Sequence, residues 1–218
     1  MSLSRRLKHR WHSLTGKNAA RQRAAQDQFV LACGELGPGQ LAIDLGANAG
    51  LFTAKLAETG ADVIAFEPDP YAVELLTQRI GKAPNVTIYA KAAGDKAGEL
   101  MLHRTANFAQ DPQRHTTSSS LLADKKNVRG GEKILIEVVD FVSFLETLDR
   151  DVAILKIDIE GAEVELMEAL LESDVCKRIQ YVFVETHERA IPRLADRTDA
   201  LRARTNGTTR PVVNWDWH

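Results

Sequence analysis

The chain has 218 residues, of which 44% are hydrophobic and 27% are charged, and its net charge is −2 at pH 7. These values describe one soluble globular domain with at most a small appendage, and they exclude wholesale disorder, collagen-like repeats and a coiled-coil rod. No run approaches the roughly 18 apolar residues that a membrane-spanning helix needs. The two cysteines make no disulfide framework and the N-terminus lacks the apolar stretch of a secretory signal, so the sequence predicts a cytoplasmic protein.

Charge is distributed unevenly along the chain. Residues 1–25 carry seven Lys or Arg residues and no acidic residue, which leaves 21 basic against 30 acidic residues in the remainder. Residues 1–28 are therefore predicted to form a basic N-terminal extension, helical in character. A solvated tail, or a helix packed on the domain, is the favoured interpretation, and a weak contact with an acidic membrane surface or an acidic partner is the alternative. The acidic excess elsewhere predicts that nucleic acid is not a partner.

Beyond residue 40 the sequence alternates between apolar strands and helical segments. Strands are predicted at 41–45, 62–66 and 86–89, and the first is followed by a helix at 51–58. A second helix runs from an N-cap at Asp69 to Gly81, with proline at its first position. Such β-α-β units indicate a mostly parallel sheet with helices on both faces, and nearly continuous apolar strands fit a sheet covered on both sides.

The rest of the domain, which is predicted to span 29–218, departs from this alternation. Strands at 99–103 and 133–139 form an inserted β-strand pair around a polar stretch at 104–131. A loop of this length in a compact domain is usually a lid, a substrate loop or a disordered segment, and a lid-like loop is predicted here. Further elements are predicted as a helix capped by Asp140, a strand at 152–157, a helix at 161–171 and strands at 181–184 and 211–217.

A glycine-rich turn connects the first predicted strand to the helix that follows it, with the sequence Asp44-Leu45-Gly46-Ala47-Asn48-Ala49-Gly50. Glycines allow a sharp turn and a close approach of a ligand, and the helix N-terminus offers free N–H groups. Ligands of open α/β sheets bind beyond the carboxyl ends of the strands. The turn therefore predicts a ligand site, although a tight turn without a ligand is the alternative.

An acidic residue, Glu67, ends the second strand, 17 residues beyond Gly50. A carboxylate in this place accepts hydrogen bonds from a ribose diol, as in dinucleotide sites. The middle glycine of the dinucleotide fingerprint is replaced by Asn48, and Asp44 suits a cationic amino group better than a diphosphate. S-adenosylmethionine carries both an ammonium group and a ribose diol, so it is the predicted cofactor.

Three segments together resemble the FkbM family of S-adenosylmethionine-dependent methyltransferases: the glycine turn, then Ala65-Phe66-Glu67-Pro68-Asp69, then Leu155-Lys156-Ile157-Asp158-Ile159-Glu160-Gly161-Ala162-Glu163. The third segment is the most specific to the family, and the resemblance covers residues 41–187. It implies a Rossmann-like class I methyltransferase fold. It also implies O-methylation of a hydroxyl on a carbohydrate, polysaccharide or secondary metabolite.

The resemblance assigns roles to residues of this chain. The methionine half of the cofactor would be held by Asp44, Gly46, Asn48 and Gly50, and its ribose by Glu67. The adenine would be bordered by Asp95 and by the backbone at Ala93. A serine-rich stretch at 118–121 is similar to one that the family often has, which makes Ser119 and Ser120 candidate substrate residues.

The acceptor side is predicted at the end of the strand at 152–157. Lys156, Asp158 and Glu160 alternate, so an extended chain would direct them to one side, and Glu185 and His187 end the next strand. Asp158 is the preferred base or acceptor-orienting group, with Lys156 positioning it. His187 is a second candidate base, and Glu160 a candidate substrate contact.

Other interpretations stay open at this point. An acid-rich crevice with a histidine would suit Mg²⁺ or Mn²⁺, but no tight ligand spacing supports a metal, and none is predicted. Glu160 and Glu163 could simply favour a helix N-terminus, and Lys156 could simply neutralise Asp158. The competing functions are an NAD(P)-dependent oxidoreductase and a non-catalytic, methyltransferase-like binding domain.

Overall fold

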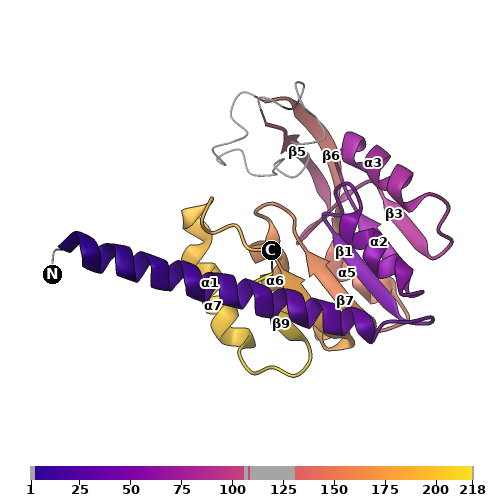
Figure 1. Ribbon diagram of the computed structural model, residues 1–218. Helices are drawn as coiled ribbons and strands as arrows, with labels where there is room; N and C mark the ends of the chain where they lie inside the picture. The colour runs from indigo at the N-terminus through magenta and orange to yellow at the C-terminus, as the bar shows by residue number, and fades with distance from the viewer. Residues whose placement is uncertain (1–2, 106–107, 109–130, 218) are drawn as a thin grey trace.

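The computed structural model describes residues 3–105, 108 and 131–217, with the backbone alone for 3–18. Its main sheet has the order β3-β2-β1-β7-β8-β9, and every neighbouring pair is parallel. The strands are β1 (Leu41–Leu45), β2 (Asp62–Phe66), β3 (Val86–Tyr89), β7 (Val152–Ile157), β8 (Ile179–Val184) and β9 (Val212–Asn214). The predicted α/β class I methyltransferase fold is confirmed, because β1 and β7 occupy the middle of a parallel sheet with helices around it (Figure 1).

A second, smaller sheet has the order β4-β6-β5. The strands β5 (Gly98–His103) and β6 (Lys133–Asp140) pair antiparallel, so the predicted inserted pair is present. The prediction of a pair alone is incomplete, because β4 (Ala92–Gly94) adds a third strand parallel to β6. Its three small residues resemble a turn in sequence, and only the pairing with β6 makes them a strand.

Local capping explains where several helices begin. After residue 40, the helices in the described ranges are α2 (Leu51–Glu58), α3 (Pro70–Ile80), α5 (Phe141–Thr147), α6 (Glu163–Glu172), α7 (Ala195–Thr205) and the short 3-10 helices η3 (Asp174–Arg178) and η4 (Pro192–Leu194). The side chain of Asp69 accepts the N–H of Tyr71, and that of Asp140 accepts the N–H of Ser143. The helix predicted from residue 161 begins at Glu163, because Glu160 and Gly161 take positive φ angles of 58° and 115°.

Side chains of the central strands alternate between two apolar clusters on the two faces of the sheet. Ile43 and Leu155 belong to the larger cluster, which includes residues of α5, α6 and α7, whereas Ala42 and Ile154 belong to the second. All four are buried, as expected for central parallel strands covered on both faces. Lys156 is two residues beyond Ile154 and therefore faces the second cluster.

A long helix, α1 (Leu3–Gly34), precedes the sheet and projects beyond the domain at its N-terminal end (Figure 1). Its C-terminal turns pack on the domain through Ala25, Phe29 and Ala32. The ring of Phe29 lies 4.4 Å from that of Trp217 and 5.1 Å from that of Phe183. None of the helices within the described ranges combines the length and apolar character that crossing a membrane requires.

Candidate active site

The glycine turn packs against protein rather than standing open. Gly46 and Gly50 have φ angles of 74° and 79°, which disfavour other residues. A Cβ at Gly46 would overlap the carbonyl oxygen of Asp158, and one at Gly50 would lie 2.5 Å from Leu76 Cδ1. Both glycines are therefore required by neighbouring chain segments. The motif alone suggested ligand approach, and the contacts with the end of β7 and with α3 could not be read from it.

Glu67 joins the two turns at the carboxyl ends of β1 and β2. Its Oε2 accepts the N–H of Asn48 and its Oε1 accepts the N–H of Asp69, both at 2.8 Å. The residue is 7% exposed. Burial raises the pKa of its carboxyl to about 7, although the two backbone hydrogen bonds act in the opposite direction. Each oxygen keeps a second lone pair, so the group can accept further donors.

Asp44 is fully buried and its carboxylate is already used by the protein. Oδ1 lies 3.0 Å from Lys156 Nζ, and Oδ2 accepts the hydroxyl of Thr53 at 2.7 Å. Lys156 Nζ also donates to the carbonyl of Gly46 at 3.3 Å. Burial lowers the pKa of Lys156, but Asp44 and Asp158 raise it by more, so the ammonium stays charged. This pair braces β1 against β7, a role that sequence reasoning did not assign to Asp44 or Thr53.

Asp158 and the residues that end β8 gather beside this brace. Asp158 Oδ2 lies 3.7 Å from Lys156 Nζ. Ligand atoms of Asp158, Glu185 and His187 all lie within 4.8 Å of one another. Burial raises the pKa of Asp158 to about 7; Lys156 opposes this shift, and Glu185 and Glu160 add to it. The structure thus brings together acceptor-side residues that the sequence places at the ends of two separate strands.

His187 lies between two carboxylates. Its Nε2 is 3.2 Å from Glu160 Oε2, and its Nδ1 is 2.9 Å from Glu163 Oε1, although this second contact is out of line for a hydrogen bond. Burial lowers the pKa of His187, but the two carboxylates raise it to about 11, so the imidazole is a cation. Glu163 also accepts the N–H groups of Ile159 and Gly161. It therefore holds the turn after β7, rather than only favouring the start of α6.

The remaining predicted site residues lie apart from this cluster or outside the described residues. Ala93 is buried in the core cluster that contains Phe66, so its side chain is occupied by packing. Asp95 is partly exposed, with Oδ2 3.4 Å from Lys96 Nζ. Ser119 and Ser120 lie outside the described residues, as does most of the polar stretch predicted as a lid.

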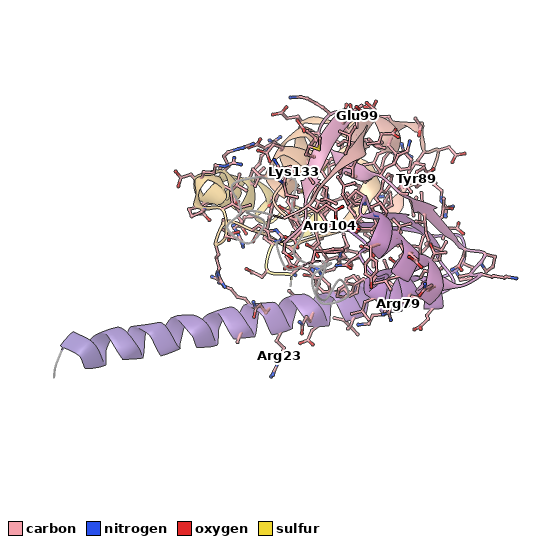
Figure 2. The ribbon with its side chains drawn as sticks, turned by 90° about the horizontal axis from the view of Figure 1, so that it is seen from above. Arg23, Arg79, Tyr89, Glu99, Arg104 and Lys133 are labelled. Atoms are coloured by element: carbon pink, nitrogen blue, oxygen red, sulfur yellow. The ribbon has the colours of Figure 1, made fainter. Side chains whose placement is uncertain are left out.

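The start of that polar stretch is anchored beside Glu67. The guanidinium of Arg104 donates to both oxygens of Asp69, at 2.6 and 2.8 Å, and to Glu132 at 2.7 Å. It also lies 4.0 Å from the ring centroid of Phe108. In Figure 2 Arg104 lies within the body of the domain, whereas Arg23 points away from α1. Asp69 thus caps α3 and also anchors Arg104, a link with no local sequence signal.

The parallel sheet and the helices that cover it form the class I methyltransferase fold. Residues 44–206 match the family model described as the methyltransferase FkbM domain, and since this match spans most of the chain, the protein belongs to that family. The predicted family membership is confirmed.

Individual relatives match over different lengths. The chain is 24% identical over 172 residues to the hexuronic acid methyltransferase AglP of Haloferax volcanii, covering 78% of this chain and 66% of that protein. A ribosomal RNA small subunit methyltransferase A of Thermotoga maritima is 41% identical over 59 residues, 27% of this chain and 21% of that protein. The crystal structure of methyltransferase FkbM from Methylobacillus flagellatus superposes with a TM-score of 0.44 at 17% identity, covering 78% of this chain and 39% of that one. The chain thus spans less than two thirds of each of these relatives.

Proposed function

We propose that the protein is an S-adenosylmethionine-dependent O-methyltransferase that acts on a hydroxyl of a carbohydrate, polysaccharide or secondary metabolite. The observation that carries this proposal is the position of Glu67. The chain belongs to a methyltransferase family, and Glu67 follows β2 directly beside the glycine turn. Asp158 and His187 lie at the same edge of the sheet, two and three strands away from β2.

The residues of this edge fit the cofactor. Glu67 holds each oxygen in place with one backbone N–H and leaves a lone pair on each for a ribose diol. Asn48 and the turn from Gly46 to Gly50 would bind the methionine half. Asp44 would support this turn indirectly, because it binds Lys156, which donates to the carbonyl of Gly46. Ala93, through its backbone, and Asp95 would border the adenine. S-adenosylmethionine, when bound, supplies an activated methyl group.

The chain itself supplies alignment and a place for a proton. Methyl transfer to a hydroxyl oxygen forms an O–C bond, breaks an S–C bond and releases the hydroxyl proton. Asp158 orients the hydroxyl and accepts that proton, and Lys156, 3.7 Å away, fixes the carboxylate. His187, held between Glu160 and Glu163, lies beside Asp158. Glu160 would contact the acceptor.

A sugar is the acceptor class with the most support. The relative AglP is described as a hexuronic acid methyltransferase, and it matches this chain over 172 residues. The ribosomal RNA methyltransferases match over a much shorter segment, such as 59 residues in the Thermotoga maritima protein. We therefore place a glycan hydroxyl ahead of nucleic acid.

Thermal melting with S-adenosylmethionine, S-adenosylhomocysteine and NAD tests the cofactor. Ligand at about 100 times its dissociation constant stabilises the fold by about 2.7 kcal/mol, which is a shift of several degrees at this size. Both adenosyl compounds should shift the melting temperature, Glu67→Ala should abolish the shift, and Glu67→Gln should reduce it. Glu74→Ala, which changes another glutamate on the neighbouring α3, is the matched control and should keep it.

Transfer is then measured with radiolabelled cofactor on a panel of neutral sugars, hexuronic acids and hexosamines. Labelled product that is stable to mild base identifies an ether rather than an ester. Cofactor binding without turnover on any hydroxyl acceptor would instead support a non-catalytic, methyltransferase-like binding domain.

A further inference from the structure

Three potential metal ligands meet at the ends of two neighbouring strands. Asp158 follows β7, and Glu185 and His187 follow β8. The register pairs Ile157 with Val184, and the N–H of Glu185 donates to the carbonyl of Ile157, so Asp158 and Glu185 are fixed side by side. Their ligand atoms and one of His187 lie within 4.8 Å of one another.

This spacing is close to that of a coordination shell. Oxygen and nitrogen ligands lie about 2.1 Å from Mg²⁺, so ligands opposite each other are roughly 4 Å apart. Small side-chain rotations of Asp158, Glu185 and His187 would therefore bring all three onto one cation. Two carboxylates and an imidazole form a donor set that suits Mg²⁺ or Mn²⁺.

Charge at this end of the sheet also favours a cation. Four carboxylates lie around the side chain of His187, those of Asp158, Glu160, Glu163 and Glu185. The positive charge of Lys156 is partly neutralised by Asp44. Negative charge therefore exceeds positive charge in a half-buried place, where solvent screens it poorly.

The neighbours of His187 form the support that a metal-binding imidazole needs. Such an imidazole usually donates its other ring N–H to a carboxylate, which fixes the orientation of the ring. Glu160 and Glu163 flank the ring at 3.2 and 2.9 Å. Both ring nitrogens face a carboxylate in the structure. A cation that binds one nitrogen displaces the proton from it, while the carboxylate at the other nitrogen keeps the ring oriented.

We propose that Asp158, Glu185 and His187 bind one divalent cation, Mg²⁺ or Mn²⁺, at the point where the acceptor hydroxyl arrives. Binding needs only these residues, whereas its catalytic consequence rests on the proposed methyl transfer. A cation held there would supply Lewis-acid chemistry at the acceptor oxygen, with Asp158 still taking up the proton. Sequence reasoning considered such a cation and predicted none, because the three ligands come from two strands and Asp158 and Glu185 are 27 positions apart.

The direct test is Mn²⁺ titration of the full chain without cofactor or acceptor, followed by the EPR signal of aqueous Mn²⁺, which is lost on binding. One saturable site per chain is expected, and Mg²⁺ should compete for it. Asp158→Asn, Glu185→Gln and His187→Gln should each weaken Mn²⁺ binding by about tenfold or more. Glu188→Gln is the matched control, because Glu188 follows the same strand and its Oε1 lies 3.6 Å from Arg202; it should change affinity by less than about threefold.

Circular dichroism melting of each variant separates lost binding from lost folding, and the near-isosteric Glu185→Gln carries the argument if the others unfold. No saturable Mn²⁺ binding, or equal binding by wild type and Glu185→Gln, overturns the proposal. Glu67→Ala should keep the Mn²⁺ site while losing S-adenosylhomocysteine. The two proposals can therefore fail separately. If only the cofactor assignment is wrong, wild type binds Mn²⁺ but binds no adenosyl compound.

Discussion

Replacing Lys156 by methionine removes a buried cation and leaves a buried anion behind. Lys156 and Asp44 are both at most 1% exposed, and Asp44 would keep the hydroxyl of Thr53 as a neutral partner. Breaking a buried pair from one side costs about 3–5 kcal/mol, because the remaining charge is uncompensated. For a chain of this size each kcal/mol lowers the melting temperature by about 2–4 °C, so Lys156→Met should lower it by about 6–20 °C.

The partner substitution is expected to cost less. Asp44→Asn leaves Lys156 with Asp158 at 3.7 Å and with the carbonyl of Gly46 at 3.3 Å. The cost should therefore be about 1–3 kcal/mol, the range for losing a buried hydrogen-bond partner. The double variant has neither charge, so its destabilisation should fall below the sum of the two single values by about 2 kcal/mol.

Urea unfolding followed by circular dichroism gives the three free energies, and the slope of each transition checks that the unfolded states are comparable. Lys55→Met is the control: it removes a lysine from the last turn of α2, outside the buried pair, and should cost less than about 1 kcal/mol. A Lys156→Met variant as stable as wild type, or strictly additive single costs, would refute the brace between β1 and β7.

Three further outcomes follow from the site. Binding of S-adenosylhomocysteine, measured by calorimetry, should weaken as the pH falls below about 7, because the pKa of Glu67 is about 7 and its ionised form is the better acceptor; Glu67→Gln should lose this dependence. Arg104→Ala should destabilise the fold by about 3 kcal/mol in urea unfolding, because it leaves the buried Asp69 without its cationic partner. Arg104→Lys should recover only part of this stability, because lysine cannot make the bidentate contact with the carboxylate. Gly46→Ala should abolish cofactor binding or folding, as a melting curve would show, because its Cβ would meet the carbonyl of Asp158; a wild-type curve with the usual ligand shift would contradict the close contact.

Features encoded over a few residues could be predicted from the sequence. The strands at 41–45, 62–66 and 86–89 match β1, β2 and β3, because short apolar runs bounded by turns carry their own signal. The caps at Asp69 and Asp140 were also correct, since a cap needs only a polar side chain and the N–H groups just after it.

Features that depend on contacts between distant segments were missed. Strand β4 exists only through pairing with β6, which lies about 40 positions later in the chain. Arg104 meets Asp69 across 35 positions, and Lys156 meets Asp44 across 112. A single sequence gives no signal for such pairs, so the prediction of Asp44 as a cofactor contact did not include its ion pair with Lys156.

The Lys156–Asp44 pair and the glycine turn connect the proposed cofactor site with the proposed acceptor site. Gly46 lies against the carbonyl of Asp158, and Lys156 reaches both the carbonyl of Gly46 and the carboxylate of Asp158. A displacement of the cofactor turn must therefore move the end of β7, where the acceptor is proposed to bind. Methyl transfer requires donor and acceptor to be closely aligned, so this contact would serve the proposed reaction as well as the fold. Substitutions at Lys156 should consequently reduce turnover by more than their effect on stability alone accounts for.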